Sequence, residues 1–418
     1  MKAYIRFSIL PLAAIFLLFN SGNVFGQADS YVTISGVVKD AQTREVINFA
    51  SVSVSGTDIG TVTNSEGEFT LKISNTLNAK SIEISHLSYL NKSFKIEEYL
   101  GDEKVFFLEP HVFQLKEVNV VPDDAKAIVK MAFERISTNY SEKPNMMTGF
   151  YRETIRQRHD YLSISEALID IYKAPYTGYL NDQVKILKGR NGRNVKKADT
   201  LLVQLQGGPN VSLLLDIVKN TDLSIGLNDL DNYAFELSNF ANVDDKLNYV
   251  ISFKPIAVKS EPLYIGKLYI NQESMGITMA EFTLDLNDQE KAANMFVQKK
   301  PMGLLFLPTN TSYMVTYKEQ NGKYYLNYVR IELKFKCDWK RRWFKNNYTI
   351  ISEVAVTDRK EDKITRFANQ DQFKTNMILA DKIQSFTDAN FWEDYNIIEP
   401  EQSIQSAIKK FTKSMKNK

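Results

Sequence analysis

The feature that most constrains the fold is a series of short alternating runs between residues 32 and 121. They recur roughly every 8 to 12 residues, separated by Gly, Asn, Asp and Ser clusters, with no helical period between them. Seven runs can each bury one face: VTISGVVKD, NFASVSVSG, EFTLKI, SIEISHL, KSFKI, KVFFLEP and LKEVNVV. This pattern predicts a seven-stranded β-sandwich of about 90 residues that folds independently. Alternation assigns these side chains to its core: Val37, Val52, Val54, Phe69, Leu71, Ile84 and Phe107.

The stretch GTDIGTVTNSEGEFTL, residues 56–71, places three glycines between two β-branched runs. We expect two tight turns around one short strand. Gly56 and Gly60 would relieve a left-handed backbone, and NSEG would form the second turn with Gly67 at its end.

The same residues resemble the carboxypeptidase-like regulatory domain, a small sandwich found at the N-terminus of many exported and outer-membrane proteins of Gram-negative bacteria. The resemblance covers residues 33–121 and includes the glycines, the threonine before the second turn and the G-x-F element. Asn64 departs from the Asp that is usual in the family, a change that turn chemistry tolerates. The resemblance implies no activity, because in zinc carboxypeptidases this module accompanies a separate catalytic domain.

The strand pattern ends at Pro122, where DDAKAIVKMAFERISTNY begins. Its apolar residues share one helix face: Ile128, Val129, Ala132, Phe133, Ile136 and Tyr140. Asp123 is the expected N-cap of this helix. We therefore predict a domain boundary near residue 122.

Longer alternating runs dominate the second half, among them NYVISFKP, YIGKLYIN, GITMAEFTLDL and YTIISEVAVTD. Asn321-Gly322 between two such runs predicts a hairpin, and GPNVSLLLDIVKN predicts a second apolar helix. The predicted fold is an N-terminal all-β sandwich of the Ig or transthyretin-like type, followed by an α+β domain. That second domain, residues 122–400, would contain a large curved antiparallel sheet and few helices.

This second half also carries resemblances. AFERISTNY…GFYRE (residues 132–153), YIGKLYIN and FWEDYNIIEP (residues 391–400) resemble uncharacterised exported proteins in which the same sandwich comes first. GKLYINQESMGITMAEFTLDL is similar to the repeated strands of the half-barrel in periplasmic lipoprotein carriers. The second resemblance implies a domain that holds an apolar ligand.

The N-terminus has the layout of a secretory signal. Lys2 and Arg6 precede an apolar run over residues 7–19 and the small polar stretch NSGNVFGQ. The run is shorter than the roughly 18 to 20 residues that span a bilayer. We expect residues 1–26 to be a signal peptide cleaved before Gln27, with an uncleaved anchor as the alternative. No cysteine near that point would carry a lipid, so the predicted location is the periplasm, or the outer membrane by peripheral association.

Charge and cysteine usage exclude some partners. Loss of Lys2 and Arg6 takes the formal net charge from +2 to about zero, so no uniform field attracts nucleic acid or membrane. Cys337 is the single cysteine, so an exported chain must rely on apolar burial instead of an internal disulfide. We expect no nucleic-acid partner.

Catalytic signatures are weak. The histidines have no metal-ligand spacing, the S-x-x-K match at residues 406–409 lacks its companion motifs, and no phosphate loop or dinucleotide fingerprint is present. A glycosidase pair would need facing carboxylates, which a chain with 50 acidic residues offers by chance. The histidines and carboxylates considered are His86, His111, His159, Glu153, Glu166 and Asp170. We predict that the protein is not an enzyme and uses no metal or cofactor.

Two basic segments are candidate surface sites. CDWKRRWFKNNY, residues 337–348, gathers four cations and two indoles around a predicted hairpin. It is either a solvated turn or a patch for lipid headgroups or a partner; the candidate residues are Lys340, Arg341, Arg342, Trp343 and Lys345. Residues 401–418 predict a basic amphipathic helix, which would lie on a membrane or dock on its own sheet.

These features support two functions. The first is a non-enzymatic exported envelope protein whose second domain binds a hydrophobic ligand or an outer-membrane protein. The alternative is a structural or adaptor protein of the envelope without a small-molecule ligand. We expect the sheet to curl around the helices and to leave a mainly apolar concavity between them. An apolar groove of this kind would favour the first function, and a filled interior would favour the second.

Overall fold

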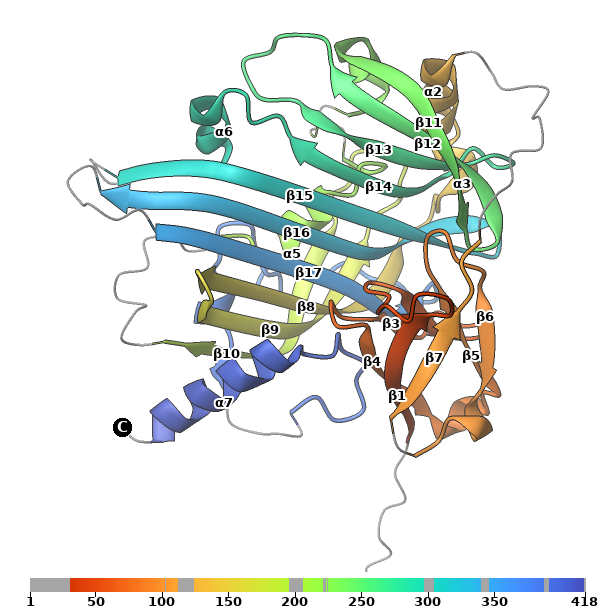
Figure 1. The fold of residues 1–418 in the computed structure, drawn as a ribbon, viewed down its shortest axis with the longest axis vertical. Coiled ribbons are helices and arrows are strands. Elements are labelled where there is room, and N and C mark those ends of the chain that lie inside the picture. The colour runs from red at the N-terminus through yellow and green to blue at the C-terminus, as the bar shows by residue number, and fades with distance from the viewer. Residues whose placement is uncertain are drawn as a thin grey trace, which may run out of the picture.

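The computed structural model describes residues 31–101, 103–111, 124–194, 206–220, 223, 225–296, 304–339, 346–386 and 391–416. A small sandwich, drawn in red and orange in Figure 1, lies against one end of a large curved sheet. The predicted signal peptide, the strand LKEVNVV and the basic patch at residues 340–345 lie outside the described residues.

The sandwich consists of two sheets with strand orders β4-β1-β7 and β3-β2-β5-β6. Its strands are β1 (Tyr31–Asp40), β2 (Ser51–Val54), β3 (Gly60–Val62), β4 (Glu68–Ser74), β5 (Ser81–Ser85), β6 (Lys92–Lys95) and β7 (Lys104–Leu108). β1 pairs antiparallel with β4 and parallel with β7. The all-β sandwich predicted from the alternating runs is confirmed, and the short strand expected between the two turns is β3.

Most of the predicted core is buried: Val52, Val54, Phe69, Leu71 and Ile84. Two assignments are wrong, because Val37 and Phe107 are only half-buried. Their neighbours Val38 and Phe106 face the core instead, each with no exposed surface. In both strands two apolar residues are adjacent, so strand alternation alone does not decide which of the two faces the core. An assignment shifted by one residue moves every side chain to the opposite face of the sheet.

The turn stretch follows the prediction at two of its three glycines. Gly56 and Gly67 have φ of 74° and 77°, and the Gly67 N–H donates to the carbonyl of Asn64 at 3.1 Å. Gly60 is a different case, because it lies inside β3 and is not among the residues with positive φ. A Cβ there would lie 2.8 Å from the carbonyl oxygen of Val52, so close strand packing requires this glycine.

The second half forms one eleven-stranded sheet with the order β11-β12-β13-β14-β15-β16-β17-β8-β9-β10-β18. Its strands are β8 (Asn145–Gln157), β9 (Asp160–Lys173), β10 (Gln183–Arg193), β11 (Tyr233–Val243), β12 (Lys246–Pro255), β13 (Tyr264–Asn271), β14 (Ile277–Leu284), β15 (Leu304–Gln320), β16 (Lys323–Trp339), β17 (Asn346–Lys360) and β18 (Gln384–Ser385). Neighbours are antiparallel except β10 and β18. Asn321 and Gly322, with φ of 51° and 76°, form the predicted tight hairpin between β15 and β16.

The helices are α2 (Ala125–Glu134), α3 (Ile136–Asn139), α5 (Pro209–Leu214), α6 (Gln289–Phe296) and α7 (Gln402–Lys416). The N-cap of α2 is Asp124, whose carboxylate accepts from the Lys126 N–H at 2.9 Å; Asp123, the predicted cap, lies outside the described residues. Within the described ranges, no helix has the length and apolar character of a membrane span.

The two faces of the large sheet are covered differently. α2, α3 and α5 cover one face and form the main core with it. The sandwich, the segment 391–400 and α7 lie on the opposite face, which faces the viewer in Figure 1. The apolar side of α7 packs against Ile164 and Phe386 through Ile404, Ala407 and Phe411, so this helix docks on its own sheet, one of the two alternatives above.

Candidate functional site

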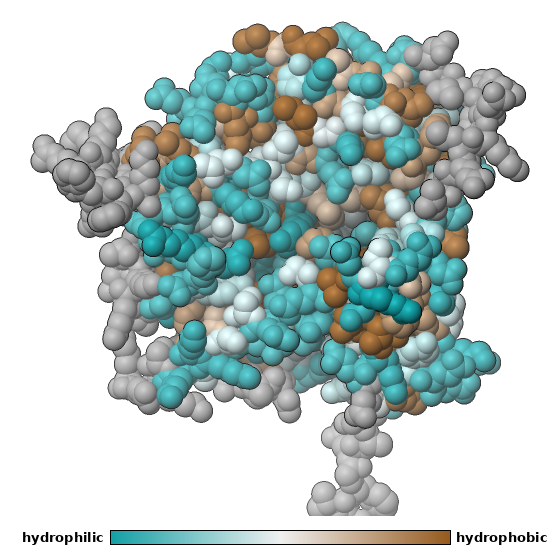
Figure 2. Space-filling model, in the orientation of Figure 1, coloured by the Kyte–Doolittle hydropathy of each residue, from teal (hydrophilic) through white to brown (hydrophobic). Residues whose placement is uncertain are grey.

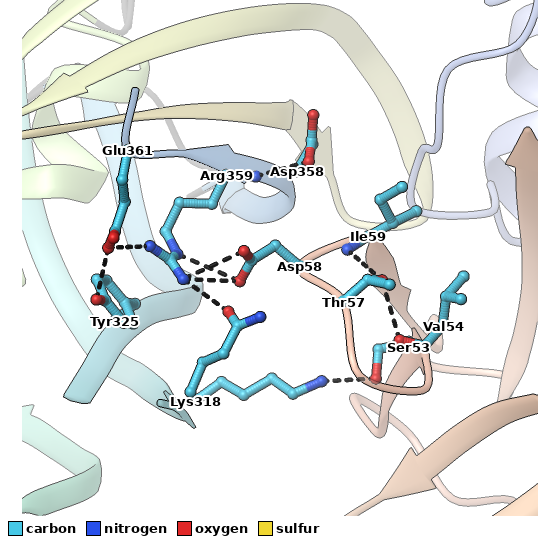
Figure 3. A network of polar contacts seen from close by, with 11 residues as sticks. Ser53, Val54, Thr57, Asp58, Ile59, Lys318, Tyr325, Asp358, Arg359 and Glu361 are labelled. Atoms are coloured by element: carbon cyan, nitrogen blue, oxygen red, sulfur yellow. Dashed lines mark hydrogen bonds and ion pairs between the residues drawn. The ribbon is translucent and has the colours of Figure 1, made fainter. Parts of the chain in front are cut away.

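The first turn of the glycine-rich stretch joins the sandwich to the end of the large sheet (Figure 3). Arg359 on β17 donates to both oxygens of Asp58 at 3.0 and 3.2 Å through Nη2, and to Gln320 at 2.7 Å. Its guanidinium lies 3.5 Å from the ring centre of Tyr325. Burial raises the pKa of Asp58, and the charge of Arg359 opposes that rise. A buried cation with this many partners holds the two domains in one orientation.

The rest of the stretch binds the C-terminal segment. The Thr61 hydroxyl donates to the carbonyl of Ile397 at 2.8 Å, and the Asn64 amide donates to the carbonyl of Glu399 at 3.2 Å. An aspartate at position 64 would have no donor for this carbonyl. Asn64, where the family usually has Asp, therefore makes an interdomain hydrogen bond that an aspartate could not make.

A third anchor lies at the β11–β12 turn. The Asn242 amide donates to the carbonyl of Tyr89 at 2.8 Å, and the Ser88 N–H donates back to the carbonyl of Asn242 at 2.9 Å. Asp245 accepts from the N–H of Asn91 at 2.9 Å. The sandwich is thus fixed to the sheet on both sides of the space between them.

A groove made of two adjoining cavities begins in that space and continues along the sheet. One, of about 790 Å³, lies across β11 to β15, and the other, of about 360 Å³, lies between the sandwich and the same sheet. Glu281 and Met314 line both cavities. Figure 2 shows a hollow in this part of the molecule, surrounded by hydrophilic and hydrophobic side chains. We call the two cavities together the junction groove.

The strand register assigns the larger cavity to the face without α2, α3 and α5. Glu236, Lys267 and Glu281 lie in one cross-strand row that lines it. Phe253 and Phe282, the next residues after this row along β12 and β14, also border the cavity, but they belong to the main core on the other face. The concavity therefore differs in place from the prediction, which put it between the sheet and the helices. Periodicity alone does not decide which sheet face a helix covers.

The junction groove combines aliphatic surface with charges of both signs. Met279, Met314 and Leu87 pack together beneath the sandwich, while Glu236, Lys254 and Lys267 are exposed along the larger cavity. Glu281 accepts from the Tyr269 hydroxyl at 2.8 Å. His86 lines the sandwich side, and burial lowers its pKa to about 4. Such a lining suits a ligand with an apolar body and polar ends.

The predicted carboxylates do not form a glycosidase pair. Glu166 pairs across the strands with Arg152 and is held by Arg152 and Arg190 at 2.8 and 2.9 Å. Burial raises the pKa of Glu166, but the two arginines outweigh burial and lower it. Glu153 alternates with Arg152 along β8 and points to the other face of the sheet, so no cleft brings Glu153 and Glu166 together. Asp170 lies opposite Thr148 on the neighbouring strand, and its carboxylate accepts a hydrogen bond from the Thr148 hydroxyl at 3.0 Å.

The histidines are separated. His86 lines the junction groove, and His159 lies in the tight β8–β9 turn. His111 follows β7. Within the described ranges, no group of three His, Cys, Asp or Glu side chains is arranged to hold a metal ion. Sequence reasoning missed Asp58, Arg359 and Met314, because only the fold brings residues so far apart together.

The comparisons with known proteins support the assignment of the N-terminal domain. Residues 34–120 match the family model of the CarboxypepD_reg-like domain, so the sandwich is a domain of that kind and the predicted resemblance is confirmed. The match covers about a fifth of the 418 residues. A search of curated proteins found no match.

Solved structures align with a larger part of the chain. One is a DUF1329 family protein from Desulfovibrio piger, with 10% sequence identity over 58% of this chain and 95% of the other and a TM-score of 0.24. Another is a putative outer membrane lipoprotein-sorting protein domain from Vibrio parahaemolyticus, with 10% sequence identity over 58% of this chain and 95% of the other and a TM-score of 0.26. A LolA superfamily protein from Nitrosomonas europaea aligns at 12% sequence identity over 58% of this chain and 94% of the other, with a TM-score of 0.19. TM-scores this low carry no conclusion about the second domain.

Proposed function

We propose that this chain is a non-enzymatic protein of the bacterial cell envelope that binds a ligand with an apolar body and polar ends in the junction groove. The observation that carries the proposal is the pair of adjoining cavities at a domain junction, where ligand sites are common. Ile265, Met279 and Met314 would hold the apolar part of the ligand. Glu236, Lys254 and Lys267 at the rim would bind its polar ends.

Two further features support a binding role, and a third supports an exported location. Methionines such as Met279 and Met314 adapt to ligands of different shape. The anchored sandwich preorganises one wall, which lowers the entropy lost on binding. The regulatory-like domain implies export, and with the N-terminal signal layout this supports a location in the periplasm or, as the alternative, in association with the outer membrane.

The alternative is an adaptor that offers only its outer surface to an envelope partner. The interdomain contacts favour it, because Arg359, Asn64 and Asn242 tie the sandwich to the second domain at three places. The basic patch Lys340, Arg341, Arg342, Trp343 and Lys345 is a proposed contact surface for such a partner.

Displacement of a fluorescent fatty acid distinguishes the two functions. Met314→Arg places a long cationic side chain where the two cavities meet, and we expect probe affinity to fall at least about tenfold, since loss of one buried apolar contact amounts to about 1.4 kcal/mol. Met295→Arg is the matched control, because Met295 is 40% exposed on α6 and lines neither cavity. No probe binding by the unaltered protein, or equal binding by the Met314 variant, would leave the adaptor function standing.

A further inference from the structure

The loop between β12 and β13 holds two aliphatic side chains in solvent. Val258 is 94% exposed and Ile256 is 64% exposed, the two largest exposures of aliphatic side chains in the described part of the chain. Figure 2 shows hydrophobic atoms gathered at the top edge of the molecule, above β12 and β13. Scattered single exposures are ordinary, but two neighbouring branched side chains at one loop tip suggest a contact surface.

The loop is fixed to the rest of the domain, so this exposure is part of its structure. The N–H groups of Ile256 and Ala257 donate to the carbonyl of Asn232 at 2.8 and 3.2 Å. At the other end Leu263 is 6% exposed, and its carbonyl accepts from the Asp285 N–H at 2.8 Å. Both ends are therefore held while the tip projects.

The size of the tip favours a lipid surface over a protein partner. A stable protein interface buries on the order of 800 Å² on each side, and two aliphatic side chains cover only a small part of that area. Interfacial insertion into a bilayer needs no such area, because each side chain that leaves water contributes by itself. Charged groups of both signs surround the tip, and they match the phosphates and amines of a headgroup layer: Lys254, Lys259, Lys291, Glu261, Asp285 and Asp288.

We propose that residues 256–263 form a membrane-contact site at which Ile256 and Val258 enter the headgroup–acyl boundary of a phospholipid bilayer. This contact does not use the basic patch or α7. It does not require the proposed ligand function, but it would add to it, because the junction groove reaches the base of the loop at Lys254 and Ile265. A ligand leaving the bilayer would meet the open end of the groove there.

Vesicle sedimentation tests the proposal with the purified protein and vesicles of phosphatidylethanolamine and phosphatidylglycerol. We expect the unaltered protein to sediment with the vesicles, and the double variant Ile256→Ser, Val258→Ser to lose roughly tenfold in partitioning for each side chain that enters the membrane. The matched control is Tyr179→Ser, Leu180→Ser. These two residues are 103% and 47% exposed in the loop between β9 and β10, at the opposite end of the strands. Equal sedimentation of the loop variant, or loss in the control instead, would overturn the proposal.

A second measurement keeps the test independent of folding defects and of the groove. A polarity-sensitive fluorophore on Val258→Cys should shift to shorter wavelength when vesicles are added, and an unchanged spectrum would contradict insertion. The loop variant should still bind the fluorescent fatty acid without vesicles, and Met314→Arg should still sediment. Failure of the membrane contact and failure of the ligand function are therefore distinguishable.

Discussion

Replacing Glu153 with Gln tests how one buried carboxyl sets the pH dependence of stability. Glu153 is 5% exposed, and the Tyr151 hydroxyl donates to it at 2.8 Å. Ser352 donates to Tyr151 at 3.1 Å, which extends the polar chain towards α5. Burial raises the pKa of Glu153 to about 7, against the opposing effects of the Tyr151 hydrogen bond and the charge of Arg193. Arg193 is 37% exposed and faces Asp381 at 3.6 Å.

The sign and size of the effect follow from proton linkage. An unfolded Glu153 loses its proton near pH 4.5, whereas the folded protein keeps it up to about pH 7. Between these values the folded state binds more protons, so raising the pH lowers the free energy of unfolding. One pH unit corresponds to about 1.4 kcal/mol, and the full range corresponds to roughly 3 kcal/mol. Glutamine accepts the same hydrogen bond without ionising, so the variant should lack this loss.

Urea unfolding at a series of pH values measures the effect as a difference between the two proteins. We expect Glu153→Gln to gain roughly 3 kcal/mol relative to the unaltered protein between about pH 4 and pH 8, with equal m-values. Glu97→Gln, which replaces an exposed glutamate on the sandwich, is the matched control. A stability difference that stays constant over this pH range would refute the reasoning, because it would mean that Glu153 has the same pKa in the folded and in the unfolded protein.

Three further outcomes test the domains and their junction. In urea unfolding, Leu71→Ala should lower the free energy of unfolding by roughly 2–5 kcal/mol, and Val37→Ala, at a half-buried position, should lower it by less than about 1.5 kcal/mol. Equal losses would mean that the two residues are assigned to the wrong faces of their strands. Arg359→Ala should cost about 1–3 kcal/mol and speed limited proteolysis between the domains, and unchanged cleavage would count against the anchor. Asn64→Asp should cost about 1–3 kcal/mol by removing the amide hydrogen bond to the Glu399 carbonyl, to which Arg152 donates only at 3.5 Å, whereas an unchanged thermal midpoint would mean that Arg152 or water replaces the amide.

Local signals in the sequence predicted local structure well. Asn321-Gly322 predicts its hairpin because both residues tolerate positive φ. The apolar stripe of α2 predicts the buried face of that helix, including Ile128 and Val129 at 2% and 0% exposed. In such cases the spacing along the chain and the geometry of the element carry the same information.

The sequence contained no signal for contacts between residues that are far apart along the chain. Asp58 and Arg359 are separated by 301 positions, and nothing near either residue indicates the other. Adjacent apolar residues such as Val37 and Val38 leave the strand phase open until partner strands are placed. The side of the sheet that bears helices is likewise fixed by long-range packing, so the sequence predicted a concavity and placed it on the wrong face.

The position of the sandwich links the turn stretch to the proposed function. Phe49, His86 and Leu87 of the sandwich form one wall of the smaller cavity, and the sheet forms the other. Anchors on both sides, at Arg359 and at Asn242, hold the wall at a fixed distance. If ligand uptake widens this cavity, we expect the Asp58–Arg359 anchor to open first, because Asp58 is 26% exposed and Asn242 is only 2% exposed. An adaptor would keep the same contacts closed. The two functions therefore differ in whether the sandwich moves, and a change in proteolysis at the junction when ligand is added would reveal that movement.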